Sequence, residues 1–384
     1  MEFLIPWLLS AGVKILIVLV GAYLLNTISQ RSIVKNIRMA EPGKEPLLNP
    51  CMQFLTIFLF IAIFSTGVYS QKTPEPIIDI HVHANHANFA GMVPMTLCIH
   101  NEEYPTSQTG AQWGHALLAA SKKCKHPLVS PTTDDEVMNQ TLAIFKKRNI
   151  IGVTSGRLTQ KWQNAAPDRI IPSMIYRADG TDPSADSMRT LFLKGKYRVF
   201  GEVHAHYEGI SADDSSLFSY WAMAEELNIP VGIHIGPGPI GAPYIGWKNY
   251  RARLHSPLQL EEVLLKHPRL RVNIMHAAWP MIDDLLAMLW AHPQLYVDIS
   301  GIITDLNEKA FYSYLQKIIE PGFGNRIMFG SDSMIWPELV EEALKTIENA
   351  QFLTKAQKRD ILYNNAARFL DLSEEEIKKH HSLR

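Results

Sequence analysis

From residue 77 onward, short apolar runs alternate with longer segments that carry their apolar residues on one helical face. The short runs are rich in Ile and Val, whose branched side chains favour strands. The strands predicted from this pattern cover residues 77–83, 150–154, 169–176, 198–203, 230–235, 270–275, 295–300 and 326–329. The predicted helices cover residues 134–148, 159–165, 183–194, 217–227, 258–266, 281–291, 308–319, 337–349 and 355–370.

This alternation predicts the fold class. Strands that alternate with helices form parallel sheets, and eight such units over about 300 residues are typical of an α/β (β/α)₈ TIM barrel. The rival architecture is an open doubly wound sheet, which would call for a glycine-rich phosphate loop after the first strand. The residues there are His83-Ala84-Asn85-His86, so the barrel is favoured.

The first 72 residues follow another pattern, and we predict that residues 73–384 form the barrel domain by themselves. Residues 3–25 are apolar apart from Lys14, and residues 52–69 are a second uncharged apolar run. The first run is long enough to span a bilayer. The connector between the runs is basic, which places it in the cytoplasm under the positive-inside rule. One or two hydrophobic helices would then anchor the chain to a membrane and leave the barrel outside the cytoplasm.

A cleaved signal peptide is the alternative. Residues 54–68 resemble a signal-peptide core, and small residues precede Gln71. Either interpretation predicts an exported barrel that is membrane-anchored, or periplasmic or secreted after cleavage. In an oxidising compartment Cys98 and Cys124 would either form a disulfide or remain separate thiols, and the spacing alone does not decide between them.

Composition narrows the range of partners. The formal net charge is −1 and 20% of residues are charged, which shows no bias toward nucleic acid. We therefore expect a small-molecule substrate, no nucleic-acid partner, a membrane contact through residues 1–72, and either a monomer or a homodimer. Residues 84–133 show little periodicity outside a helix near 111–122, and they predict a long loop over the site.

Ionisable residues stand at the ends of several predicted strands. His81 and His83 alternate along the first strand, so their rings point the same way. The other ionisable residues at predicted strand ends are Glu202, His234, His276 and Asp332. Each alone is explained as a satisfied buried polar group. Six of them at one end of a barrel would be costly to bury without a compensating cation. The pattern therefore predicts a metal site.

These motifs resemble the metal-dependent amidohydrolase superfamily, and most closely its amidohydrolase-related branch, which includes aminocarboxymuconate-semialdehyde decarboxylase. The resemblance covers residues 77–372. It is carried by Ile78-Asp79-Ile80-His81-Val82-His83, Leu264-Leu265-Lys266-His267-Pro268, Val297-Asp298-Ile299-Ser300-Gly301, Asn325-Arg326-Ile327-Met328-Phe329-Gly330-Ser331-Asp332 and Asn365-Ala366-Ala367-Arg368-Phe369-Leu370.

The resemblance implies roles for individual residues. His81, His83, His234 and Asp332 would hold zinc, with Asp332 also the catalytic base. His276 would be a second catalytic group or a ligand to a second metal. Glu202 stands where TatD-like hydrolases place a bridging carboxylate, so the site would hold either one metal ion or two. The alternative role of Glu202 is to orient a ligand histidine.

The implied activity is hydrolysis of an amide, ester or lactone by a metal-activated water. The alternatives are a non-oxidative decarboxylase of an unsaturated or aromatic acid and a membrane-tethered binding protein without turnover. The substrate is not specified by the sequence. A basic loop after the fifth strand, with aromatic residues among its cations, is either a carboxylate or phosphate subsite or a solvated loop; its residues are Trp247, Lys248, Tyr250, Arg251 and Arg253.

Overall fold

The computed structural model describes residues 74–89, 91–121 and 123–383, which belong to the second of two units of the chain, Thr73–Arg384. Both predicted apolar helices and the cleavage site lie outside the described residues. Within the described ranges, no helix is both long enough and apolar enough to cross a membrane.

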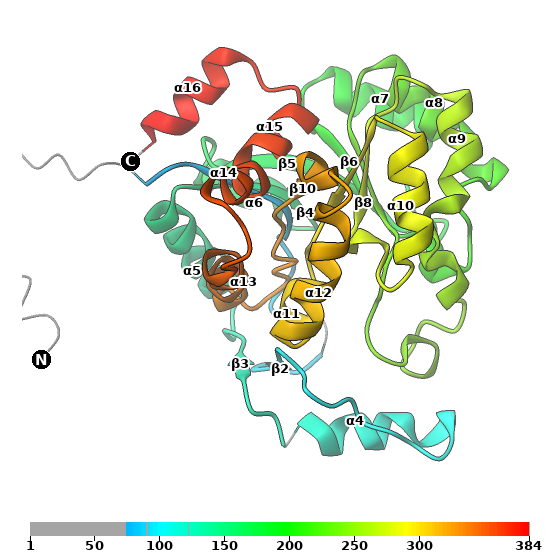
Figure 1. Cartoon of the computed structure of the whole chain (residues 1–384), viewed down its shortest axis with the longest axis vertical. Coiled ribbons are helices and arrows are strands. Elements are labelled where there is room, and N and C mark those ends of the chain that lie inside the picture. The colour runs from blue at the N-terminus through cyan, green and yellow to red at the C-terminus, as the bar shows by residue number, and fades with distance from the viewer. Residues whose placement is uncertain (1–73, 90, 122, 384) are drawn as a thin grey trace, which may run out of the picture. The chain divides into compact units, whose positions relative to one another are not determined.

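The core of the unit is a ring of eight parallel strands (Figure 1). In chain order, which is also their order around the sheet, they are β1 Ile77–His83, β4 Ile150–Ser155, β5 Ile170–Tyr176, β6 Val199–Val203, β7 Val231–His234, β8 Val272–Met275, β9 Leu295–Asp298 and β10 Ile327–Met328. Nearly every strand residue is buried, because side chains face either the barrel interior or the helices outside.

The ring closes between its first strand and the segment that follows its last. The Ile80 amide donates to the Phe329 carbonyl at 3.0 Å, and the Asp332 amide donates to the His81 carbonyl at 2.9 Å. The Asp79 carboxylate strengthens this closure, since it accepts hydrogen bonds from the amides of His81 and Ser331. The predicted (β/α)₈ barrel is therefore confirmed for the described residues.

Helices surround the ring, and their bounds follow local signals closely (Figure 1). α5 begins after a capping box formed by Thr133 and Glu136, and its first turn is acidic while its last turn is basic. The helices between strands are α5 Asp134–Arg148, α6 Thr159–Ala165, α7 Ala185–Leu193, α8 Phe218–Glu226, α9 Glu261–Lys266, α10 Ile282–Ala291, α11 Ile302–Asp305 and α12 Glu308–Ile319, and α13 Glu338–Asn349 follows the last strand.

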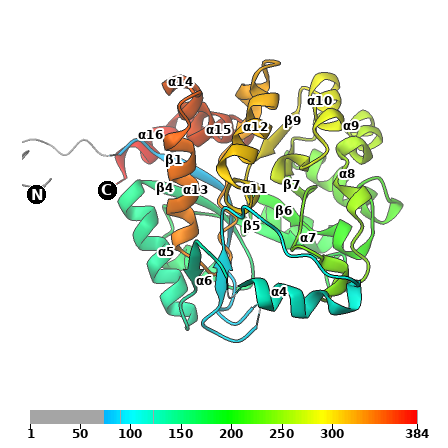
Figure 2. The same ribbon diagram turned by 60° about the horizontal axis from the view of Figure 1, so that its bottom comes forward.

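Residues 84–133 are more ordered than their sequence predicts. They contain a two-stranded antiparallel sheet, β2 Thr96–Cys98 with β3 Pro127–Val129, and the helix α4 Trp113–Ser121. Cys98 and Cys124 form a disulfide, which settles the alternative that the sequence left open. Figures 1 and 2 show this segment at the end of the barrel where β1 finishes, opposite α15 and α16. It therefore covers the carboxyl ends of the strands.

The carboxy-terminal region closes the other end of the barrel. The single helix predicted over residues 355–370 is divided into α14 Lys355–Arg359, a π-helical turn Asp360–Asn364 and α15 Asn365–Phe369. A further helix that was not predicted, α16 Glu374–Ser382, begins with a capping box of Ser373 and Glu376. Phe369 packs in a buried cluster with Ile78 and Met328.

Candidate metal centre

The barrel brings all six predicted site residues together at the carboxyl ends of its strands. His81 and His83 lie on β1, Glu202 on β6 and His234 at the end of β7, while His276 and Asp332 follow β8 and β10. The histidines and Glu202 are at most 5% exposed. The side chain of Asp332 is 16% exposed, so it is the member of the set most accessible to a small molecule.

One group of donors is formed by β1 and the segment after β10. The Nε2 atoms of His81 and His83 lie 3.0 Å apart. Oδ1 of Asp332 lies 3.1 Å from Nε2 of His83 and 3.5 Å from Nε2 of His81. Three ligand atoms of the kinds that bind zinc thus meet at one point.

Glu202 lies at the junction of the whole cluster. Its Oε2 is 3.2 Å from Nε2 of His81 and 3.3 Å from Nε2 of His83. Its Oε1 contacts Nδ1 of His234 and lies 3.7 Å from Nε2 of His276. The carboxylate therefore faces every histidine that the sequence assigned to the site.

The outward ring nitrogens have partners that fix the orientation of the histidines. Nδ1 of His81 lies 2.8 Å from the Ser300 hydroxyl, and Nδ1 of His276 lies 2.9 Å from the Ser300 carbonyl. Nδ1 of His83 lies 3.2 Å from the Ser155 hydroxyl. Such outer contacts leave Nε2 of each ring free to act as a ligand.

Asp298 organises the segment that carries Ser300. Its carboxylate accepts hydrogen bonds from the amides of His276 and Ser300, at 3.1 and 3.0 Å, and from the side chain of Asn273 at 2.7 Å. Burial opposes its ionisation, but His81, His276 and Ser300 lower its pKa to about 2. Asp298 thus stays anionic behind the histidines without being part of the donor cluster.

The two central carboxylates determine the charge of the site. Burial raises the pKa of Glu202, but His204, His81 and His234 outweigh it and hold the pKa well below its usual range. Burial likewise opposes ionisation of Asp332, but its histidine neighbours lower the pKa. Both groups are therefore anions that require positive charge nearby.

The pKa values of His81 and His234 shift in opposite directions. Burial alone would lower the pKa of His81, but Glu202 and Asp332 raise it well above its ordinary value. His234 behaves differently, because burial and the neighbouring His276 lower its pKa to about 3 despite Glu202. At neutral pH, His234 is therefore an unprotonated ring of the kind that binds a metal ion.

The donor set fits a divalent cation. Oδ1 of Asp332 is buried, and the ring nitrogens Nε2 of His83 and His81 lie 3.1 and 3.5 Å from it. Buried carboxylate oxygens are normally paired, hydrogen-bonded or bound to metal. Imidazole nitrogens and carboxylate oxygens are ligands that suit zinc and other divalent transition metals.

Sequence reasoning missed His204. Its Nε2 lies 2.7 Å from Oε2 of Glu202, although it follows the last residue of β6. His206 was also missed: its ring stacks on His234 with a centroid distance of 4.3 Å. The spacing Glu202-Val203-His204 repeats the alternation of His81 and His83, which is the signal that could have identified His204.

In the basic loop after β7, one of the cations is hydrogen-bonded to the backbone of the same loop. The guanidinium of Arg251 donates to the carbonyls of Lys248 and Tyr250, both at 2.9 Å. The Tyr250 hydroxyl is buried and accepts from the Gly238 amide at 2.9 Å. These contacts favour the solvated-loop interpretation for Arg251 and remove Tyr250 as a stacking surface, whereas Trp247 remains 38% exposed.

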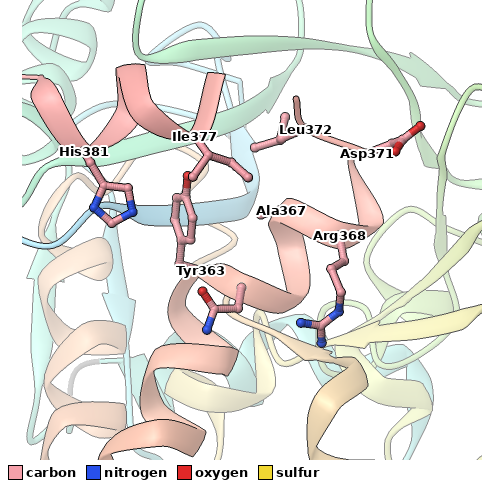
Figure 3. A pocket seen from close by; sticks show the side chains of 8 residues that line it. Tyr363, Ala367, Arg368, Asp371, Leu372, Ile377 and His381 are labelled. Carbon is pink, nitrogen blue, oxygen red and sulfur yellow. The ribbon is translucent and has the colours of Figure 1, made fainter. Parts of the chain in front are cut away.

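One pocket among the described residues lies away from this cluster. It has a volume of about 470 Å³ and lies beside α15 and α16 (Figure 3). Its lining residues are Tyr363, Asn364, Ala367, Arg368, Asp371, Leu372, Ile377 and His381. None of them belongs to the donor cluster, so we place the chemistry at the opposite end of the barrel.

A barrel with histidines and carboxylates at the carboxyl ends of its strands defines a class of metal-dependent enzymes. The family model of the amidohydrolases matches residues 78–372 of this chain. The chain therefore belongs to the amidohydrolase family, as its motifs predicted. No curated protein matches it.

Several solved structures are similar to this chain. A protein described as a probable 2-pyrone-4,6-dicarboxylic acid hydrolase from Acinetobacter baumannii is 16% identical, with 77% of this chain and 99% of that chain covered and a TM-score of 0.49. The 2,6-dihydroxybenzoate decarboxylase from Rhizobium is 13% identical, with 78% and 99% covered and a TM-score of 0.46. The 5-carboxyvanillate decarboxylase from Novosphingobium aromaticivorans, solved with manganese, is 12% identical, with 58% and 76% covered and a TM-score of 0.44.

Proposed function

We propose that this protein is a metal-dependent hydrolase that directs water at the carbonyl carbon of an amide, ester or lactone. The observation that carries the proposal is the meeting of Asp332 and Glu202 with four ring nitrogens at the carboxyl ends of the strands. Family membership supports the class of enzyme. The type of bond that is cleaved is proposed here, because family membership supports only the class of enzyme.

His81, His83 and Asp332 would hold a divalent ion, for which we propose zinc, with Glu202 and His234 beside it. A divalent ion bound there would supply Lewis acidity and would make a water molecule acidic enough to act as a nucleophile near neutral pH. Asp332 and His276 would perform the proton transfers around it.

Asp332 would act as the general base. Its side chain is the most accessible of the six predicted site residues. It would accept a proton from the attacking water and pass it to the leaving group. Glu202, whose side chain is only 3% exposed, is less suited to that exchange.

His276 would stabilise negative charge on the substrate oxygen. Its Nδ1 lies 2.9 Å from the Ser300 carbonyl, an acceptor that fixes a proton on Nδ1 and leaves Nε2 facing the cluster. Burial lowers the pKa of His276, but Glu202 and Asp332 more than offset it and raise the pKa overall. When protonated, the ring would donate a hydrogen bond from Nε2 to the developing oxyanion.

The test uses the full-length chain purified in detergent, stripped of metal and then reloaded with Zn²⁺. A panel of esters, lactones and amides is assayed for a titratable acid or a free amine, with the Asp332→Asn variant as control. Metal-dependent product that the variant fails to form supports the proposal. Release of carbon dioxide from an unsaturated or aromatic acid would assign the site to decarboxylation instead, and metal binding without either product would favour a binding protein.

We also propose that residues 73–384 act outside the cytoplasm. The support is the Cys98–Cys124 disulfide, which persists in oxidising compartments, together with the apolar runs in residues 1–72. A reporter enzyme that works only after export, fused behind Arg384, should be active. Activity of a cytoplasm-restricted reporter at the same position would contradict the proposed location.

A further inference from the structure

We propose that the solvent-exposed side of the metal site binds a positively charged group of the substrate, held by the carboxylate of Asp305 beside the rings of Tyr104 and Tyr207. The inference rests on the proposed function and deepens it, because it makes the substrate a cationic ester or amide, such as one that carries a quaternary ammonium group. Asp305 is the last residue of α11, a short helix after β9 that the sequence pattern did not predict.

The start of α11 lies against the metal site. Gly301 precedes the helix, and a Cβ atom at this position would be 3.0 Å from Nδ1 of His276 and 3.5 Å from Oδ2 of Asp332. The Asp305 amide donates to the Gly301 carbonyl at 2.8 Å. Residues four apart on a helix share one side of it, so Asp305 lies one turn further along from the point where α11 meets the site.

The Asp305 carboxylate carries a charge that the site does not balance. Its side chain is exposed, yet the surrounding protein and the neighbouring Asp332 raise its pKa to about 7, while His276 acts in the opposite direction. Among the described residues, no lysine or arginine is one of the groups that shift this pKa. A divalent ion would balance the charges of Glu202 and Asp332, so the charge of Asp305 would remain and attract a cation. A cation bound beside Asp305 would also lower its pKa and keep it ionised at neutral pH.

Two tyrosines supply aromatic surface near this carboxylate. The Tyr104 hydroxyl, from the segment that covers the site, donates to the Asp305 carbonyl at 3.2 Å, and Tyr104 is 41% exposed. Tyr207 belongs to the turn after β6, and its ring centroid lies 5.1 Å from that of His234. Burial raises the pKa of both hydroxyls, and the charge of Asp305 adds to the shift of each. Aromatic faces near a carboxylate suit a quaternary ammonium group, which they attract through cation–π interactions.

A solvated carboxylate is the alternative role for Asp305, since exposed ion pairs contribute little. Two probes of the same shape separate the roles: choline, and its neutral carbon isostere in which a tert-butyl group replaces the trimethylammonium group. Both are titrated calorimetrically into the zinc-loaded full-length chain and into Asp305→Asn, and the metal content of each protein is measured by elemental analysis. The matched control is Asp186→Asn, which removes an exposed acid from the first turn of α7.

We expect choline to bind at least about tenfold more tightly than the isostere to the unaltered chain and to Asp186→Asn. The preference should vanish in Asp305→Asn while the metal content stays the same. Equal binding of the two probes to the unaltered chain, or no binding of either, would overturn the cationic subsite. Retention of the preference in Asp305→Asn would overturn it as well, as would loss of metal, which would give Asp305 a role in holding the ion. In each of these cases metal-dependent cleavage of a neutral ester would leave the proposed hydrolase intact.

Discussion

Oδ1 of Asp332 lies 3.1 Å from Nε2 of His83, although 249 positions separate the two residues in the sequence (332 − 83). Closure of the barrel brings them together, because the segment after β10 pairs with β1. The backbone of Asp332 has φ of 55°, in the left-handed region that residues other than glycine rarely adopt.

This arrangement predicts the effect of Asp332→Asn. The amide keeps an oxygen for the metal ion but cannot accept the proton. Proton transfer by a positioned side chain contributes about 10²–10⁴-fold, so we expect a rate loss of at least that size with little change in metal content. Steady-state kinetics and elemental analysis of the same preparation provide the measurement. A near-normal rate would show that another group is the base.

The effect of Glu202→Gln on rate and metal content should depend on the number of metal ions bound. If two ions are bound, removal of the shared charge should lower the metal content by about half and reduce the rate more than 100-fold. If Glu202 only orients a ligand, the loss should be about 10–100-fold with the metal content maintained. Titrating the variant beside the unaltered chain distinguishes the cases, and unchanged metal content with a small rate loss would argue against a bridging role.

The Cys98–Cys124 bridge should stabilise the segment that covers the site. It closes a loop with a sequence separation of 26, for which the chain-entropy model gives about 3.5 kcal/mol of stabilisation. The double variant Cys98→Ser, Cys124→Ser should therefore be cleaved faster by protease between residues 99 and 123. Thiol titration of the unaltered chain should show two additional thiols after reduction, and no additional thiols would mean that the bridge does not form.

The lowered pKa of the buried His380 should make the stability of the folded chain depend on pH. Burial lowers its pKa to about 4, with Arg198, Lys379 and His381 adding to the effect while Glu376 opposes it. Between pH 6.5 and about 4 the unfolded chain therefore binds a proton that the folded chain does not, so stability rises with pH across this range.

The corresponding variant is His380→Asn, whose amide can replace the contact between Nδ1 and the Tyr363 hydroxyl. From pH 7 to pH 5 the unaltered chain should lose about 1–2 kcal/mol more stability than the variant. Denaturant unfolding at both pH values provides the comparison. An equal loss in both proteins would show that His380 does not titrate in this way.

Much of the barrel could be predicted because each strand is a buried apolar run next to an amphipathic helix. α5, α6 and α12 begin and end at the predicted residues. Strand ends were less predictable: β10 is only Ile327–Met328, because the residues after it pair with β1 through isolated hydrogen bonds.

The segment 84–133 could not be predicted at the same level. β2 and β3 have only three residues each, which is too short for a recognisable period, and their pairing is fixed by residues far away. The Trp336 indole, for example, donates to the Met95 carbonyl. The disulfide depends on the same tertiary arrangement, so the positions of the cysteines in the sequence could not decide it.

The six donors were predictable because strand ends of one barrel meet at one place. The contact of His204 with Glu202 was not, since His204 follows β6 and its direction depends on the turn there. The outer partners Ser155 and Ser300 were likewise hidden, because hydroxyl residues are common and only the folded barrel shows which ones face a histidine.

The most direct test of the metal centre is the metal content of the full-length chain and of the double variant His81→Ala, His234→Ala, with His115→Ala as the control. The account predicts about one or two equivalents of divalent metal in the unaltered chain and the control, since sites of this kind hold one ion or two. The double variant should lose nearly all of it while keeping its circular dichroism spectrum. Full retention of metal in a folded double variant would contradict the site described above.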